Sequence, residues 1–320
     1  MTLLLDEQEV TQLVSMDLAL EAAEEALRGL GDGTASNQPR RRVRTPKGIL
    51  HTMAGAVGAA GMLGAKCYTT FPGGARFVVL LFSGEDGRLL AIMEADRLGQ
   101  MRTGAASGVA TKYLARPDAD SLALLGSGWQ ARAQLEAICA VRPIRDVRVY
   151  SPTAAHREAF AREMAPVVGR PIRPCATAEE AVRGAAIVTT ITTAREPVLL
   201  GEWLEPGMHV NAAGSNWANR RELDVAAVQR ADLIFADSVE DAQLESGDLV
   251  AAVEAGALDW ARVGEIGEVI AGRRPGRADA GQITLFESQG LAVEDVALAA
   301  RVYHLARARG LGREQPLADG

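Results

Sequence analysis

The sequence has few of the residues that build disulfide frameworks and metal centres. Its three cysteines, Cys67, Cys139 and Cys175, are odd in number and far apart. They fit neither a set of disulfides nor a zinc site, and they suit a reducing cytoplasm. Four scattered histidines and the lack of an HExxH pattern argue against metal chemistry. We therefore predict no bound metal and exclude a metal hydrolase.

Long apolar runs and a basic surplus are also missing. No apolar stretch approaches the roughly 20 residues that a membrane helix needs, and the start MTLLLDEQEV is acidic where a secretion signal is basic. The net charge is −7, from 34 Lys and Arg against 41 Asp and Glu, whereas nucleic-acid-binding domains usually carry a basic face. We predict a cytoplasmic protein that binds neither membranes nor nucleic acids.

The composition is otherwise that of a globular protein with two domains. The chain has 320 residues and is 48% hydrophobic, and domains contain roughly 150 residues. Apolar side chains at helical spacing predict a packing helix over 16–30. Residues 36–93 are short β-type runs broken by turn signals, and the Asp86-Gly87 step predicts a hairpin. We expect an antiparallel sheet here, followed by a helix over roughly 95–115.

From about residue 120, apolar strands alternate with helical stretches. This alternation predicts a parallel sheet with helices on both faces, and hence an α/β fold class. We expect a Rossmann dinucleotide-binding domain at 118–290 and a mixed α+β substrate-binding and dimerisation domain at 1–117 and 291–320. The second domain is discontinuous because the last helical stretch follows the final α/β unit. The expected strands are SLALLG (121–126), VRVYS (147–151), AIVTTIT (186–192), HVNAAG (209–214) and LIFAD (233–237), with a shorter one near 171–175.

A glycine-rich turn follows the first of these strands. The run GSGWQA (126–131) is a GxGxxA pattern between the strand LALL and a helix that opens at about Gln130. The first glycine permits the tight turn, the second lets backbone N–H groups approach a pyrophosphate, and the small Ala131 allows close helix–strand packing. The helix N-terminus favours the anion. The alternative is a plain glycine turn, but the α/β units that follow favour dinucleotide binding.

The end of the second strand of this domain bears on the choice of coenzyme. An NAD-preferring site usually carries Asp or Glu there to hold the ribose 2′-hydroxyl, whereas this chain has YSPT (150–153). The hydroxyls of Ser151 and Thr153 and the cation of Arg157 can receive a 2′-phosphate. We therefore predict NADPH, with NADH as the alternative. The competing interpretation places Arg157 on a solvated helix face.

The motifs together resemble those of the ornithine cyclodeaminase / mu-crystallin family, and most of all its ketimine (pyrroline-2-carboxylate) reductase members. The resemblance extends over roughly residues 36–306 and rests on the order and spacing of separated motifs. These motifs are QPRR (38–41), GAK (64–66), MRTGAAS (101–107), GSGWQ (126–130), NAAG (211–214) and SQGLAVED (288–295).

The resemblance implies a homodimer formed through the mixed domain, a site between the domains, and hydride transfer between a nicotinamide cofactor and a small imino or amino acid. It also implies that Arg41, Lys66 and Arg102 hold the substrate carboxylate, although the run RRR (40–42) leaves the first assignment open by one position. A family threonine after the lysine has no clear match around 75–78. The residues expected at the cofactor are Arg102, Thr103, Gly126, Gly128, Trp129, Gln130, Ser151, Thr153, Arg157, Thr190, Ser288 and Gly290.

Lys66 also has a physical argument of its own. It lies in the largely apolar stretch MLGAKCYTTF (62–71), where burying an idle lysine would be costly. Beside arginines it is suited to bind an α-carboxylate or to pass a proton to an imine nitrogen. The alternative from sequence alone is an exposed edge-strand lysine, and the resemblance favours the catalytic role.

Asn216 marks the main departure from the family. Cyclodeaminases and archaeal alanine dehydrogenases of the family carry an Asp just after the Asn-Ala-x-Gly strand, where this chain has NAAGSNW (211–217). An amide cannot act as a general base for water or ammonia at neutral pH. We therefore predict a reductase that converts Δ1-pyrroline-2-carboxylate or Δ1-piperideine-2-carboxylate to proline or pipecolate, with Asn216 at the catalytic site. The alternative for this residue is a turn-forming Asn.

Two other functions stay open at this point. One is an ornithine cyclodeaminase or alanine-type amino-acid dehydrogenase in which another residue replaces the missing Asp. The other is a mu-crystallin-like protein that binds NADPH and a small ligand with little turnover. The joint presence of Arg41, Lys66 and Arg102 argues against the second, because a pure binder does not need a carboxylate clamp.

Overall fold

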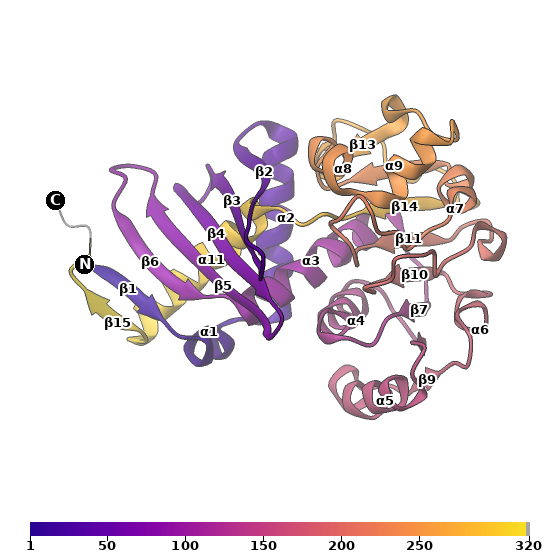
Figure 1. Cartoon of the computed structure of the whole chain (residues 1–320), viewed down its shortest axis with the longest axis horizontal. Helices are drawn as coiled ribbons and strands as arrows, with labels where there is room; N and C mark the ends of the chain where they lie inside the picture. Colours follow the sequence, from indigo (N-terminus) through magenta and orange to yellow (C-terminus); the bar gives the residue numbers. More distant parts are fainter. Residues whose placement is uncertain (318–320) are drawn as a thin grey trace. The chain divides into compact units, whose positions relative to one another are not determined.

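The computed structural model describes residues 1–317, and the chain forms two compact units. The first unit joins Met1–Arg102 to the segment that begins at Leu291, and the second is Thr103–Gly290 (Figure 1). The boundary falls within helix α3 (Asp96–Leu114), whereas the sequence pattern placed it after residue 117. Each unit is built around its own sheet.

The first unit contains a mixed sheet, which has seven strands within the described residues, in the order β15-β1-β6-β5-β4-β3-β2. Neighbouring strands are antiparallel except for the parallel β1–β6 pair. The antiparallel sheet predicted over 36–93 is therefore confirmed, including the hairpin from β5 to β6. The strands are β1 (Thr2–Leu5), β2 (Ala35–Arg44), β3 (Ile49–Val57), β4 (Met62–Phe71), β5 (Gly74–Ser83), β6 (Leu89–Glu94) and β15 (Arg313–Gln315).

Helices α1 (Glu7–Leu13), α2 (Met16–Asp32) and α11 (Ala292–Arg309) belong to the same unit. Helix α11 runs along one face of the sheet, against β3 and β4, and also packs on α2 (Figure 1). The approach of α11 is close, because a Cβ at Gly64 would lie 2.9 Å from Cγ2 of Val296. The sheet and α11 therefore pack tightly.

The two faces of the first sheet differ in burial. Along β4, Met62 and Lys66 are buried, whereas Leu63 is 43% exposed. Successive side chains of a strand point to opposite faces, so one face packs against α11 and the other remains open. The large apolar side chains exposed in this part of the sheet are Val43, Leu50, Leu63 and Phe71.

The second unit contains a sheet with eight strands within the described residues, all neighbouring pairs parallel, in the order β13-β12-β14-β11-β10-β7-β8-β9. From β7 the chain proceeds to β8 and β9 on one side and then to β10 and β11 on the other. This reversal is the switch point at which open α/β sheets bind ligands. The strands are β7 (Ser121–Leu125), β8 (Asp146–Tyr150), β9 (Ile172–Pro174), β10 (Ile187–Thr190), β11 (His209–Ala212), β12 (Leu233–Ala236), β13 (Val263–Glu265) and β14 (Thr284–Glu287).

Helices connect these strands and complete the α/β architecture that the sequence predicts. Within residues 1–317, no helix is both long and apolar enough to cross a membrane. The helical segments are α4 (Trp129–Val141), α5 (Ala154–Val168), α6 (Ala178–Val182), α7 (Val225–Arg230), α8 (Val239–Glu245), α9 (Gly247–Glu254) and α10 (Ile266–Ile270), with short 3₁₀ turns η1 (Gly201–Trp203) and η2 (Trp260–Arg262).

Candidate active site

A cluster of buried charges lies in the first unit. Nζ of Lys66 donates a hydrogen bond to Oδ1 of Asp295 at 2.8 Å, and Nε of Arg102 donates to the same oxygen at 3.1 Å. Nη1 of Arg102 donates to Oε2 of Glu294 at 3.0 Å. Lys66 is 3% exposed, Arg102 is 7% exposed, and both carboxylates are fully buried. The structure thus brings together two of the residues that the sequence predicts to hold a carboxylate.

Local structure explains how these charges come to be buried. Lys66 points inward because it lies on the helix-facing side of β4, and Gly99 of α3 leaves space for its ammonium, since a Cβ there would lie 3.1 Å from Nζ. Glu294 and Asp295 occupy the first turn of α11, where helix N–H groups stabilise negative charge. The sequence motifs alone do not indicate a role for these two acids. The feature of the sequence that could have revealed them is two adjacent acidic residues inside the otherwise apolar run LAVEDVALAA (291–300).

The cluster carries a surplus of positive charge. Burial, followed by the charge of Arg102, lowers the pKa of Lys66 to about 8, and Arg40 adds to this effect while Asp295 opposes it. Burial raises the pKa of Glu294 despite its contact with Arg102. Among the described side chains of this cluster, three cations therefore face two carboxylates. A bound anion, such as a substrate carboxylate, would balance the charge.

Arg40, and not Arg41, belongs to this cluster. Strand β2 has a bulge between Gln38 and Arg41, and Arg40 is 6% exposed while Arg41 is exposed. Arg41 pairs with Thr52, on the face opposite to Lys66. Of the arginines in the run 40–42, which the sequence leaves open by one position, Arg40 is therefore the one that we propose for the site in place of Arg41, because the extra residue of the bulge turns Arg40 inward.

The predicted cofactor residues of the second unit share one edge of the parallel sheet. Except for Thr103, which is on α3, they lie at or after the carboxyl ends of β7, β8, β10 and β14. Gly126 has φ +123°, and a Cβ there would lie 2.3 Å from the carbonyl oxygen of Ile191, so the turn requires glycine. Gly128 is the N-cap of α4, offers no side chain to cap the helix, and has open space at its Cβ position. This turn fits a pyrophosphate at the helix N-terminus.

Neighbouring side chains complete the turn. Trp129, the first residue of α4, is 50% exposed, and Gln130 is half-buried. On α3, Thr103 accepts a hydrogen bond through its carbonyl oxygen from Nε2 of Gln134 at 3.1 Å. The next residue, Gly104, packs against α4, since a Cβ there would lie 2.4 Å from backbone atoms of Ala133. The small residues of the MRTGAAS motif therefore permit close packing of α3 on α4.

The end of β8 presents hydroxyls and a cation. The Oγ atoms of Ser127 and Ser151 are hydrogen bonded at 3.0 Å, which joins the glycine turn to this strand end. Nη1 of Arg157 donates to the carbonyl oxygen of Ser151 at 2.8 Å, and Thr153 is the exposed N-cap of α5. The segment 150–153 carries no carboxylate, so this edge suits a ribose 2′-phosphate as well as a 2′-hydroxyl.

A buried acid that the sequence analysis missed joins the loops after β10 and β11. Glu222 accepts hydrogen bonds from Oγ1 of Thr190 at 2.9 Å, from the backbone N–H of Thr192 at 2.6 Å and from that of Gly214 at 2.7 Å. Burial raises the pKa of Glu222 and raises that of the adjacent Asp248 to about 7. Thr190 is thus fully buried and engaged with Glu222.

Asp237 organises the loop before α11 in the same manner. Its Oδ2 accepts hydrogen bonds from Oγ of Ser288 at 3.1 Å, from the N–H of Gln289 at 2.8 Å and from the N–H of Gly290 at 2.7 Å. Gly290 has φ +77°, a conformation that favours glycine. This arrangement fixes the backbone at the carboxyl end of β14.

Asn211 and Asn216, which both follow β10 in the chain, differ in their surroundings. Asn211 is fully buried and hydrogen bonds to His209 at 3.1 Å and to Oγ1 of Thr111 at 3.0 Å. Burial, followed by the charge of Arg277, lowers the pKa of His209 to about 3, so this imidazole is neutral and structural. Asn216 lies half-buried in the loop after β11, at the carboxyl edge of the sheet.

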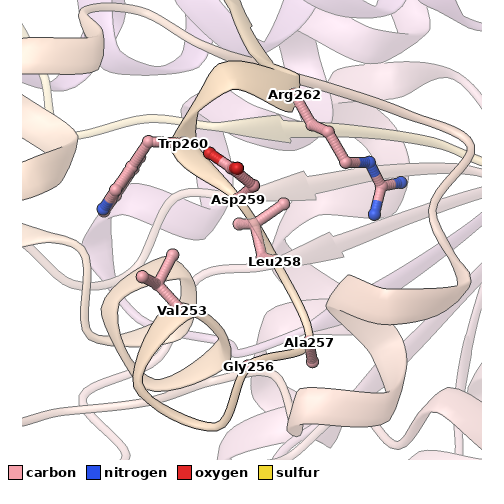
Figure 2. A pocket seen from close by; sticks show the side chains of 7 residues that line it. All are labelled: Val253, Gly256, Ala257, Leu258, Asp259, Trp260 and Arg262. Carbon is pink, nitrogen blue, oxygen red and sulfur yellow. The ribbon is translucent and has the colours of Figure 1, made fainter.

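A separate pocket of about 460 Å³ lies at the end of α9 and involves none of the predicted site residues (Figure 2). Within residues 1–317, no group of three or more His, Cys, Asp or Glu side chains is arranged to hold a metal ion. The residues that line the pocket are Val253, Gly256, Ala257, Leu258, Asp259, Trp260 and Arg262.

The fold and the two sites define the class of this protein, an NAD(P)H-dependent oxidoreductase with a Rossmann unit. The chain belongs to the ornithine cyclodeaminase/mu-crystallin family, whose model matches residues 1–310. It is 37% identical over 324 residues to the alanine dehydrogenase of Archaeoglobus fulgidus, covering 97% of each chain. It is 38% identical over 258 residues to the Δ1-pyrroline-2-carboxylate reductase of Bacillus cereus, covering 78% of this chain and 79% of the relative. The predicted family is confirmed.

Mammalian relatives and solved structures agree with this membership. The ketimine reductase mu-crystallin of Mus musculus is 36% identical over 303 residues, which cover 91% of this chain and 93% of the relative. The Δ1-pyrroline-2-carboxylate reductase of Thermococcus litoralis in complex with NADH and L-proline has a TM-score of 0.94 at 35% identity, covering 98% and 100% of the chains. An archaeal alanine dehydrogenase dimer with bound NAD has a TM-score of 0.93 at 36% identity, covering 99% of each.

Proposed function

We propose that this chain reduces cyclic ketimine carboxylates, Δ1-pyrroline-2-carboxylate and Δ1-piperideine-2-carboxylate, to proline and pipecolate. The observation that carries the proposal is the buried cluster in which Arg40, Lys66 and Arg102 outweigh Glu294 and Asp295 in charge. Such a cluster suits a substrate with one carboxylate. The similarity to reductases of pyrroline-2-carboxylate and of ketimines supports this substrate class.

The reduction adds a hydride to the imine carbon and a proton to the imine nitrogen, and NAD(P)H supplies the hydride when bound. In the proposed mechanism, Arg40 and Arg102 hold the substrate carboxylate, and the ammonium of Lys66 gives its proton to the nitrogen. A pKa of about 8 keeps Lys66 mostly protonated at neutral pH while making its proton easy to release. The hydrogen bond to Asp295 at 2.8 Å holds the ammonium in place.

The residues proposed to hold the coenzyme are those of the glycine turn and of the neighbouring strand ends. We place the pyrophosphate at Gly126, Gly128, Trp129 and Gln130, with Arg102, Thr103, Thr190, Ser288 and Gly290 as the other proposed contacts. The solved relatives hold NADH or NAD, and we propose that this chain also uses NADPH, through Ser151, Thr153 and Arg157.

The coenzyme proposal makes a direct prediction. Arg157→Ala should raise the KM for NADPH about tenfold and leave the KM for NADH within twofold, because only NADPH carries the 2′-phosphate that the guanidinium would bind. Initial rates with each coenzyme measure this difference. A strong preference of the unmodified protein for NADH would contradict the proposal.

An alanine-type dehydrogenase is the second candidate, because the Archaeoglobus relative matches nearly the whole chain. Asn216 argues against it and against ornithine cyclodeamination, since an amide cannot take a proton from water or ammonia. The test measures oxidation of NADPH and NADH with five- and six-membered cyclic ketimine acids, beside ammonia release from L-ornithine and from L-alanine with NAD. We expect imine reduction and negligible ammonia, and efficient deamination would overturn the reductase proposal.

Asn216 itself is proposed to hydrogen bond the substrate or an ordered water. Asn216→Ala should then lower kcat/KM for the imine by about tenfold without changing the KM for NADPH. Unchanged kinetics with a lower melting temperature would assign Asn216 to the turn alone.

We further propose that the first unit binds substrate and forms a homodimer, that the second unit binds the dinucleotide, and that the protein works in the cytoplasm. The open face of the first sheet supports a dimer, because Val43, Leu50 and Leu63 are 63%, 41% and 43% exposed there. Exposed apolar patches of this kind commonly mark protein interfaces. The solved archaeal alanine dehydrogenase is a dimer.

A further inference from the structure

Three aromatic rings stand side by side on the buried face of the first sheet. His51 of β3, Tyr68 of β4 and Phe77 of β5 occupy registered positions on neighbouring strands. The rings of His51 and Tyr68 are stacked, with centroids 4.1 Å apart and planes 5° from parallel. Tyr68 and Phe77 stack at 5.1 Å and 25°. The three rings form one continuous stack, which we call the aromatic wall.

The aromatic wall lies next to the charge cluster, by which we mean the buried side chains of Arg40, Lys66, Arg102, Glu294 and Asp295. Lys66 lies two residues before Tyr68 on the same strand and the same face, and its Nζ is 6.0 Å from the centroid of Tyr68 and 5.5 Å from that of Phe77. Helix α11 covers the other side of Lys66, since Asp295 binds Nζ and Val296 packs over Gly64. The carbon skeleton of a carboxylate bound at Nζ can therefore extend along the wall and not toward α11.

The wall is both fixed and uncharged. His51 is 2% exposed and is hydrogen bonded through Nε2 to Oγ1 of Thr70 at 3.1 Å. Burial, followed by the charges of Arg42, Arg40 and Arg44, lowers the pKa of His51 to about 4, so the imidazole is neutral at physiological pH. Tyr68 and Phe77 are half-buried and leave part of their surface accessible. A fixed, uncharged stack of rings beside a carboxylate-binding cluster favours a compact apolar ring over a long or charged side chain.

We propose that His51, Tyr68 and Phe77 determine substrate specificity by lining the space for the substrate ring, which limits the protein to small monocyclic carboxylates. This inference rests on the proposed function, because it places the ring beside the carboxylate held by the charge cluster. Phe77 and Tyr68 set the width of this space, and His51 supports Tyr68 from behind through the stack.

The test compares Tyr68→Ala and Phe77→Ala with Phe71→Ala, which removes a ring from the same sheet at an exposed position. The probes are Δ1-pyrroline-2-carboxylate and the bicyclic 3,4-dihydroisoquinoline-1-carboxylate, with NADPH. We expect the wall variants to raise the ratio of kcat/KM for the bicyclic over the monocyclic imine at least tenfold, with an unchanged KM for NADPH. Tyr68→Phe and Phe71→Ala should keep the ratio of the unmodified protein. A ratio unchanged within twofold in both wall variants would overturn the proposal.

A binding measurement separates this inference from the proposed function. Pyrrole-2-carboxylate and indole-2-carboxylate are planar carboxylates that cannot be reduced here, and calorimetry reports their affinity whether or not the protein reduces imines. We expect the unmodified protein to prefer pyrrole-2-carboxylate and the wall variants to lose that preference. If no imine is reduced but the wall variants lose the preference for pyrrole-2-carboxylate, the proposed reaction is wrong and the proposal for the aromatic wall is supported. If the preference is absent or the variants do not change it, the wall proposal fails.

Discussion

Lys66 is the residue of the charge cluster whose proton responds to pH within the working range. Its pKa is lowered to about 8, chiefly by burial. The ammonium is present below this pH and is lost as the pH rises through it. We therefore expect kcat/KM for imine reduction to fall above about pH 8, because the proton donor disappears. Initial rates of NADPH oxidation between pH 6 and 10 measure this fall in kcat/KM.

Substitution of Lys66 tests whether loss of its proton causes this fall in kcat/KM. Lys66→Arg keeps the positive charge but does not titrate in this range. It should lower kcat/KM about ten- to a hundredfold and give a profile without the fall near pH 8. If the fall persists in Lys66→Arg, another group causes it.

Arg40 and Arg41 are adjacent in sequence but differ in what they can bind. Arg40→Ala should reduce kcat/KM for the imine about ten- to a hundredfold, because losing a charge-assisted contact costs roughly 1.5–3 kcal/mol. Arg41→Ala, on the exposed face, should stay within twofold of the unmodified protein. Steady-state kinetics of the two variants provide a matched comparison, and the reverse result would restore Arg41 to the site.

At the scale of elements, the contact between α11 and the first sheet depends on glycine. A Cβ at Gly64 would lie 2.9 Å from Cγ2 of Val296 on α11 and 2.6 Å from the carbonyl oxygen of Leu80 on the neighbouring strand β5. Gly64→Ala should therefore destabilise the protein by about 1–3 kcal/mol, as overpacking does. Gly73→Ala is the control, since nothing lies within 4 Å of its Cβ position and its φ is not positive. Thermal unfolding measures both, and equal melting temperatures would show that β5 and α11 can shift to make room.

The elements that the sequence predicts are those with a strong local signal. The helix at α2, the hairpin after β5 and the strand–turn–helix at Gly126 each have a clear period or turn, and each is present. Strand β14 (TLFE) is not among the predicted strands, although the predicted strands β10, β11 and β12 are no longer than it. Yet it lies between β11 and β12 in the middle of the sheet.

The charge cluster also shows which features of the structure local sequence patterns can predict and which they cannot. The motifs identify Lys66 and Arg102, but the inward turn of Arg40 depends on a bulge that no periodicity reveals. Asp295 lies 229 positions from Lys66 in the chain, so their contact follows from the packing of α11 on the sheet. Residue types predict the chemistry here, and tertiary structure decides which partners meet.

At the scale of the whole molecule, the open face of the first sheet makes the oligomeric state testable. Leu50→Glu combined with Leu63→Glu should convert the proposed dimer to a monomer, because buried, unpaired carboxylates oppose association. Val167→Glu is the control, since Val167 is 58% exposed on α5 of the second unit. Light scattering after size exclusion gives the mass of each variant, and a dimer that survives the double substitution would place the interface elsewhere.

The discontinuous first unit also affects the order in which the chain can fold during synthesis. When the ribosome has reached Gly290, the whole parallel-sheet unit has been made, but the first unit still lacks α11. Lys66 and Arg102 then lack their ion pairs with Asp295 and Glu294, and burying these cations before the pairs form is costly. The buried charge cluster of the first unit can therefore form only after the last helix emerges, so the second unit in sequence is the first that can complete its core.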